Sequence, residues 1–490
     1  MNFYLYDVIF CLIFILFVVI FLYKRRKDIK VERPFILYRT KFGIKLIEKI
    51  AKKEKLLDSL EKIVIVFGYI LMLVGLFMIY LIVKIMILTP DKYMNVIKAP
   101  PIFPLIPYFT NLFHIDILPP FYFTYWIIII AIASISHEFL HGIFFKKENV
   151  KIKSTGFAFL GPFLAAFVEP DEKNMNKIER HKQLAAMAAG TFANLVVGII
   201  FAIIALIFIN LTFIQAGATF NTYVFSPINS SSISNITNNT IILDGTNMTE
   251  IKINNTSYFL DENSLKQVKN LSVVYGFEDT PALRNKLRGA IVEFDNITIK
   301  NNKQLSKVLL NYKPGDNVTI KTFFNDTIQE YNIILAARPD NNTKAYIGIA
   351  TYKLGFFGKI LSKILFLEDY KPKFNSNLII FIRDLFYWLI LINLGMAFLN
   401  MVPCFIFDGG RFFYVTMLSI TKSKKVAEVL YKFVSLIILG IFLFITLIWI
   451  FNFFLKKKIF IKIFPTKFFF IFLILGKVKK NRKVYKENNI

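Results

Sequence analysis

Long apolar stretches constrain this sequence more than any other feature, because each can cross a lipid bilayer as a helix. They lie near residues 5–22, 63–88, 122–144, 184–209, 376–399 and 427–454. A weaker seventh near 459–475 is interrupted by Lys462, Pro465 and Lys467. Hydrophobic residues make up 55% of the 490 residues. We therefore predict a polytopic α-helical membrane protein with about six or seven transmembrane helices and one aqueous domain.

The apolar stretches divide the chain into six parts. Residues 1–120 hold N-terminal transmembrane helices and a basic loop, and residues 426–490 hold a C-terminal transmembrane region and a basic tail. Two parts, 121–209 and 373–425, carry the polar motifs described below. Between them lie a polar lead-in with a few strands at 210–267 and an αβ domain at 268–340.

Basic residues predict the orientation of the chain. They follow the first, third and fifth apolar stretches, and such loops face the cytosol in a multi-pass protein of the cell membrane. Residues 210–372 are then extracytoplasmic. All N-x-S/T sequons lie in this part, although an Asn- and Thr-rich segment also generates sequons by composition. The net charge of +27 is explained by these loops, so no nucleic-acid partner is expected.

His137-Glu138-Phe139-Leu140-His141 places two imidazoles and a carboxylate inside the third apolar stretch. Residues i and i+4 share one face of a helix, so both histidines can reach one metal ion. Glu138 then lies beside a water molecule at that ion, an arrangement typical of zinc peptidases. Ionisable residues at membrane depth are costly and usually functional. This favours a zinc site over histidines that only pack a helix bundle.

A third protein ligand is expected, because catalytic zinc sites have three protein ligands and one open position. The candidate is Asp408, which follows the fifth apolar stretch in the segment Asn400-Met401-Val402-Pro403-Cys404-Phe405-Ile406-Phe407-Asp408-Gly409-Gly410. The two glycines permit a tight turn or a close helix contact, and Pro403 interrupts the regular helix. Alternatively, Asp408 only caps the helix that follows it.

Both motifs are predicted to lie toward the cytosolic side of the membrane. The third apolar stretch ends near Lys146, which places His137 about 14 Å from that boundary at about 1.5 Å per residue. Asp408 closely precedes Arg411 and is shallower by the same count. The chain near Pro403 must therefore dip back or run level if both motifs bind one ion.

These motifs resemble those of the site-2 protease family of intramembrane zinc metalloproteases. The resemblance depends on H-E-F-L-H at 137–141 and N-x-x-P-x-x-x-x-D-G at 400–409, with weaker matches at 161–170 and at 189–194. It implies that His137, His141 and Asp408 bind one Zn²⁺ per chain and that Glu138 is the general base. By the same resemblance Asn400, and by a weaker match Asn194, would hold the unwound substrate or its oxyanion.

The predicted function is hydrolysis of peptide bonds in transmembrane or membrane-proximal substrates, in regulated intramembrane proteolysis. The expected partners are a transmembrane protein substrate and the lipid bilayer. One alternative is a zinc-dependent membrane hydrolase with a non-protein substrate. The other is a non-catalytic membrane binding protein or transporter. Glu138 disfavours the latter, since binding alone has no use for a base beside the metal.

The extracytoplasmic αβ domain has a recognisable order of elements. Strands are predicted at 271–275, 289–294, 318–323 and 330–336, with helices from Thr280 to Leu287 and from Asn302 to Tyr312. This order resembles a bacterial-type PDZ domain, which site-2 proteases often carry between their two motifs. The resemblance implies a peptide ligand, but the usual glycine-rich carboxylate loop is not evident. An unrelated small αβ domain is the alternative.

Overall fold

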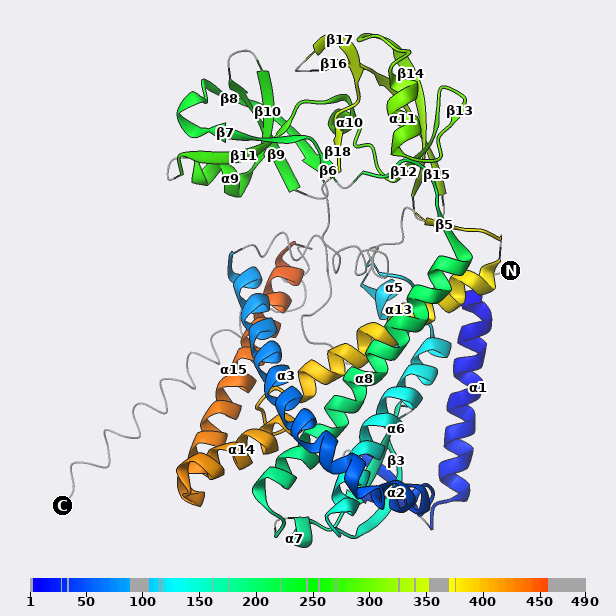
Figure 1. Cartoon of the computed structure of the whole chain (residues 1–490), viewed down its shortest axis with the longest axis vertical. Coiled ribbons are helices and arrows are strands. Elements are labelled where there is room, and N and C mark those ends of the chain that lie inside the picture. The colour runs from blue at the N-terminus through cyan, green and yellow to red at the C-terminus, as the bar shows by residue number, and fades with distance from the viewer. Residues whose placement is uncertain are drawn as a thin grey trace, which may run out of the picture.

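Six helices in the described part of the chain are long and apolar enough to cross a membrane (Figure 1). The computed structural model describes residues 3–456 except 28, 33–34, 89–104, 114, 116–117, 162, 176, 221, 244–245, 254–255, 269–270, 325–326, 339–340, 352–369 and 375. The helices are α1 (Phe3–Lys24), α3 (Glu54–Leu88), α6 (Phe123–Lys147), α8 (Arg180–Thr212), α13 (Asn377–Asn400) and α15 (Lys424–Lys456). The predicted polytopic helical membrane protein is thus confirmed, and the weak seventh stretch lies outside the described residues.

A four-stranded antiparallel sheet lies at one end of the helices, in the order β1-β2-β3-β4 (Figure 1). Its strands are β1 (Ile29–Glu32), β2 (Phe35–Thr40), β3 (Ile152–Leu160) and β4 (Phe163–Pro170). The hairpin β1–β2 follows α1, yet β2 pairs with β3, where Tyr38 lies opposite Phe157. The N-terminal segment is therefore built into the sheet that follows α6.

The inserted segment between α8 and α13 lies at the opposite end of the helices (Figure 1). The two ends of this segment lie side by side, because β5 (Phe213–Gln215) pairs with β19 (Tyr370–Pro372). Its five-stranded sheet has the order β7-β11-β10-β9-β8. The strands are β7 (Phe225–Asn229), β8 (Asn235–Leu243), β9 (Thr246–Ile253), β10 (Thr256–Asp261) and β11 (Val273–Glu278). The residues predicted as a polar lead-in thus form most of a sheet, which continues past residue 267.

A second sheet of the inserted segment has the order β13-β12-β14-β15. It contains β12 (Ala290–Phe294), β13 (Ile297–Thr298), β14 (Asn317–Phe324) and β15 (Thr327–Ile334), together with helices α10 (Pro281–Arg284) and α11 (Asn302–Leu309). The predicted strands at 289–294, 318–323 and 330–336 and both predicted helices are present, with ends shifted by a few residues. The strand predicted at 271–275 is β11, which belongs to the five-stranded sheet. The remaining pairs are β16 (Ala336–Arg338) with β17 (Asn341–Tyr346), and β6 (Thr222–Tyr223) with β18 (Ile349–Ala350). The PDZ-like interpretation stays a prediction.

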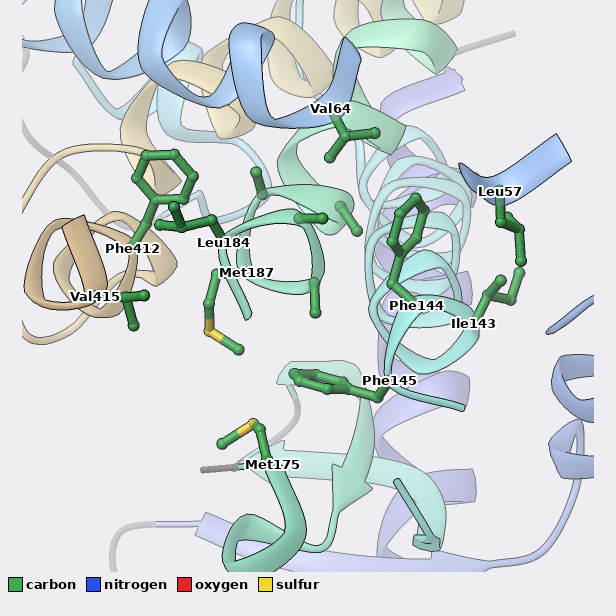
Figure 2. Packing of buried hydrophobic residues seen from close by; sticks show 14 of the residues in the cluster. Leu57, Val64, Ile143, Phe144, Phe145, Met175, Leu184, Met187, Phe412 and Val415 are labelled. Atoms are coloured by element: carbon green, nitrogen blue, oxygen red, sulfur yellow. The ribbon is translucent and has the colours of Figure 1, made fainter. Parts of the chain in front are cut away.

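Small side chains on α8 allow the helices of the core to approach closely. Ala185, Ala186, Ala188 and Ala189 are all at most 1% exposed, and they lie among larger residues from α3, α6 and α14 (Asp408–Thr421). Figure 2 shows this packing: Leu184 and Met187 of α8 lie between Phe412 of α14 and Phe145 of α6. A helix with a face of small residues permits backbone contact on that face. The close packing brings α6, α8 and α14 to one point.

Asp7 of α1 caps the first turn of α6. Its side chain accepts hydrogen bonds from the backbone N–H groups of Phe123 (2.7 Å) and Thr124 (2.9 Å) and from the Thr124 (2.5 Å) and Tyr108 (2.7 Å) hydroxyls. Tyr122, the residue before α6, makes no side-chain cap. An anionic group at a helix N-terminus also interacts favourably with the helix dipole. The 2% exposed Asp7 therefore anchors α1 to the start of α6.

Replacing Asp7 with Ala should lower the free energy of unfolding by about 1–3 kcal/mol, because buried N–H groups of α6 lose their acceptor. Asp7→Asn, which keeps one acceptor oxygen, should lose less. Thermal unfolding of the purified protein in detergent measures both. Leu5→Ala on the same helix is the control, since Leu5 is 57% exposed. Equal stability of Asp7→Ala and Leu5→Ala would contradict the capping role.

Candidate metal site and active site

Three potential metal ligands converge from two helices. The Nε2 atoms of His137 and His141, both on α6, lie 3.1 Å apart. The Oδ2 atom of Asp408, the first residue of α14, lies 3.0 Å from His137 Nε2 and 3.3 Å from His141 Nε2. The imidazoles are 6% and 7% exposed. These are the three residues that the two sequence motifs predict as ligands.

The spacing of these atoms fits a zinc ion. Zn²⁺ binds imidazole nitrogen and carboxylate oxygen at about 2.0–2.2 Å, so two ligands of a tetrahedral site lie about 3.3 Å apart. The three observed separations, 3.0, 3.1 and 3.3 Å, are close to this value. Two nitrogens and one oxygen also form the donor set of a catalytic site with an open fourth position.

A break in the chain after α13 brings Asp408 to the histidines. α13 ends at Asn400, residues 401–407 turn, and α14 begins at Asp408. A Cβ atom at Gly409 would lie 2.2 Å from the Met401 carbonyl carbon and oxygen, so only glycine lets the turn pack against α14. The N-cap of α14 is Phe407, and the Asp408 Oδ2 atom contacts both histidines. Contact with the histidines is therefore its role, rather than capping.

Groups of α8 orient both imidazoles. His141 Nδ1 lies 2.7 Å from the Ala186 carbonyl oxygen, to which it donates, and this leaves Nε2 for a metal. His137 Nδ1 lies 3.1 Å from Asn194 Nδ2, while the buried Oδ1 of Asn194 has no hydrogen-bond partner in the described chain. A metal on Nε2 requires a proton on Nδ1. With the amide oxygen and nitrogen of Asn194 exchanged, the amide oxygen accepts this proton.

Gly190 provides the space that the imidazoles occupy. A Cβ atom at this position would lie 2.3 Å from His141 Nε2 and 2.7 Å from His137 Cδ2. Real Cβ atoms do not approach other atoms so closely, and both rings are fixed by the hydrogen bonds to α8. The α8 backbone therefore forms one wall of the metal site, and any larger residue at 190 displaces the ligands.

Glu138 is held by the sheet. Its Oε2 atom accepts a hydrogen bond of 2.9 Å from the backbone N–H of Val168 in β4. The Ser134 hydroxyl, one turn earlier on α6, accepts another of 3.2 Å from the Ala166 N–H. β4 thus lies against α6 along the turn that precedes the first ligand. The second carboxylate oxygen of Glu138 remains available for a proton.

A cavity of about 970 Å³ reaches the site, and Glu138, His141 and Asp408 contribute to its lining. Arg39 of β2 lines it as well and donates a 3.0 Å hydrogen bond to Glu169 of β4. The Ser154 hydroxyl donates to the same carboxylate at 2.6 Å. These two donors, Ser154 first, hold the pKa of Glu169 below its usual range. Glu169 therefore stays ionised at neutral pH and keeps Arg39 of the N-terminal hairpin in the cavity wall.

Other candidate residues are not joined to the site. Asn400 is the partly exposed last residue of α13, and no described residue of the metal site forms a hydrogen bond with its side chain. Asn194 is fully buried against His137, a position that suits orientation of the ligand. His181 lies near Glu61 and Glu179 at the start of α8, and His114 lies outside the described residues.

Three contributions to the site could not be predicted from the sequence. The Val168 N–H and the Ala186 carbonyl are backbone groups, which no residue pattern identifies. Arg39 lies more than a hundred residues from Glu169, and only the sheet brings them together. The run of small residues that ends in Gly190 was the available signal, because it indicates a helix face that others approach closely.

Gly190→Ala should weaken zinc binding at least tenfold, the usual lower bound for losing the groups that orient metal ligands. Zinc content after dialysis against limiting zinc, measured by mass spectrometry, tests this. Gly395→Ala on α13 is the matched control, since nothing lies within 4 Å of the added Cβ atom. Full zinc retention by Gly190→Ala would show that the ligands do not need the space at Gly190.

Comparison with known proteins agrees with this geometry. An uncharacterized protein from Methanocaldococcus jannaschii is 31% identical over 185 residues, which cover 36% of this chain and 46% of that protein. The chain thus spans less than half the length of this relative. A family model described as Peptidase family M50 matches residues 125–443, a range that contains His137, Glu138, His141 and Asp408. The chain therefore belongs to Peptidase family M50, the site-2 protease family.

Proposed function

We propose that this protein is a zinc endopeptidase that cleaves transmembrane or membrane-proximal proteins, as in regulated intramembrane proteolysis. The observation that carries the proposal is the convergence of His137, His141 and Asp408 beside Glu138, where the two histidines and Glu138 lie on a helix long enough to span a membrane. Family membership supports a membrane peptidase. The identity of the metal, the location of cleavage and the substrate class are inferred from the site.

The side chains divide the chemistry between them. His137, His141 and Asp408 would hold the zinc ion, which when bound lowers the pKa of a water molecule and polarises a carbonyl. Glu138, fixed through Oε2 by Val168, takes a proton from the attacking water at Oε1 and delivers it to the leaving amine. The Ala186 carbonyl and the Asn194 side chain keep the imidazoles in place during this transfer.

The substrate must present an accessible peptide carbonyl. A transmembrane helix hides its carbonyls in internal hydrogen bonds, so the substrate has to unwind before cleavage. We propose that Asn400, next to the break at residues 401–407, hydrogen-bonds the unwound backbone or the oxyanion. The interrupted helix supports this role, because an amide at such a break can turn toward a chain that enters the site.

A non-protein substrate is the rival function. The cavity supports a peptide better, because the edge strand β4 lines it, and an extended chain can pair with carbonyl groups at the edge of a sheet. The inserted segment, proposed to be extracytoplasmic, would restrict access for substrates with bulky external domains.

Glu138→Gln should abolish cleavage while zinc content and folding stay normal, because the amide cannot accept the proton. A loss of about 10²–10⁴ in turnover is expected for a general base. Cleavage of a fluorescent transmembrane peptide by purified protein in lipid nanodiscs is the measurement. Glu330→Gln, at an exposed position of β15, is the control. Near-normal turnover of a zinc-loaded Glu138→Gln protein would assign the base elsewhere.

Asn400→Ala should retain zinc and stability and lose roughly 10²–10³ in turnover, the usual loss for one oxyanion donor. The same peptide assay, normalised to bound zinc, gives the result. A lower melting temperature with unchanged turnover per zinc would instead make Asn400 a structural residue.

The proposed topology places residues 210–372 outside the cell, and the loop after α14 and the start of α15 in the cytosol. It is motivated by the basic residues in the other loops. Single cysteines at exposed Ser232 and Lys425 test it, in a background with Cys11 and Cys404 replaced. An impermeant thiol reagent added to intact cells should label Ser232→Cys and spare Lys425→Cys. The reverse pattern would invert the topology.

A further inference from the structure

Helix α2 (Ile44–Ala51) lies at the end of the spanning helices where α1 and α6 end and α3 begins (Figure 1). It is a short helix between the β1–β2 hairpin and α3, and it packs on α6. Because the basic ends of α1 and α6 adjoin it, α2 lies at the level of the membrane surface rather than within the hydrocarbon region.

The surface of α2 has three stripes. Ile47 and Ala51 face the protein and are 1% and 5% exposed. Phe42, just before the helix, and Leu46 form an exposed apolar stripe, at 89% and 51%. A basic stripe lies beside it and consists of exposed lysines at helical spacing: Lys41, Lys45, Lys49, Lys52 and Lys53. An apolar stripe flanked by lysines is the pattern of a helix that lies in a membrane interface.

The lysines of this stripe have no anionic partner in the described part of the chain. Other basic residues at the same end of the molecule are paired: Lys147 with Asp58 and Glu61, and Lys182 with Glu148. Glu48, in the same stretch, is paired with Lys146. The five neighbouring lysines repel one another, so an anion outside the protein lowers their energy. Its source must lie where Phe42 and Leu46 are also buried, which a lipid headgroup region provides.

We propose that α2, with Lys41 and Phe42, binds anionic phospholipid headgroups and that this binding acts on the catalytic helix. Ile47 packs over Gly142, the residue after His141, with its Cδ1 atom 2.9 Å from the position of a Cβ there. Glu48 of α2 forms a 2.9 Å ion pair with Lys146. Seating α2 on an anionic surface therefore holds the end of α6 that carries the metal ligands.

Lipid binding is measured directly and does not depend on catalysis. Phe42→Trp protein is placed in phosphatidylcholine nanodiscs that contain a small, equal fraction of brominated phosphatidylglycerol or brominated phosphatidylcholine. For each lipid, the quenching measured with the unsubstituted protein is subtracted from that of Phe42→Trp, and the two differences are compared. The native tryptophans Trp126, Trp388 and Trp449 are only 2%, 1% and 8% exposed. We expect stronger quenching by phosphatidylglycerol.

The triple variant Lys45→Gln, Lys49→Gln, Lys52→Gln should reduce this preference at least tenfold, since each lysine near a membrane surface contributes about fivefold. The triple variant Lys45→Arg, Lys49→Arg, Lys52→Arg keeps the charge and should keep the preference. The charge-matched control is the triple variant Lys300→Gln, Lys303→Gln, Lys307→Gln, at exposed positions of the inserted segment.

Equal quenching by the two lipids would overturn the proposal, as would a preference that survives the three glutamines at Lys45, Lys49 and Lys52. An equal loss in the control variant would assign the effect to net charge and would also overturn it. The coupling to α6 is read from zinc retention in nanodiscs with and without phosphatidylglycerol. Zinc should dissociate more slowly with the anionic lipid, and this difference should disappear in the glutamine variant.

Discussion

The structure depends on placing two imidazoles and two carboxylates where the surroundings are mostly apolar. Unpaired polar groups at such a place are costly, so these side chains need defined partners. His141 has the Ala186 carbonyl, His137 has Asn194, and Glu138 has the Val168 N–H. The glycine at 190 and the turn at 401–407 then remove the steric obstacles to convergence. The turn after α13, the face of small residues on α8 and the sheet against α6 thus act together to position these side chains.

The spanning helices and the convergence of the three candidate ligands were predictable from the sequence because their signals are local. Apolar length identifies a span wherever its neighbours lie, and the i, i+4 spacing puts His137 and His141 on one face before any tertiary contact forms. Asp408 required one further step, in which Pro403 and the two glycines indicated a turn at membrane depth. The structure places that turn at residues 401–407, and α14 begins with its carboxylate at the histidines.

Contacts between distant segments were not predictable. The pairing of β2 with β3 joins residues more than a hundred positions apart, and short strands of mixed character carry no signal for it. The five-stranded sheet was underestimated for a related reason: its Asn- and Thr-rich strands lack the alternation of a half-buried strand. Asp7 did leave a visible signal, a lone acid in an apolar stretch. Its partner was not visible, because the N–H groups at the start of α6 are backbone atoms.

The N-terminal region acquires a role from these contacts, although it precedes the range that matches the family. Asp7 holds the first turn of α6, while Ile47 and the Glu48–Lys146 pair hold its last turns. Lys147 adds ion pairs of 2.7 and 2.6 Å to Asp58 and Glu61 of α3. A helix held by contacts at both ends resists sliding along its axis. A shift of one residue would move the two histidines by about 1.5 Å. Such a shift exceeds the tolerance of a tetrahedral site, so the N-terminal elements fix the register on which metal binding depends.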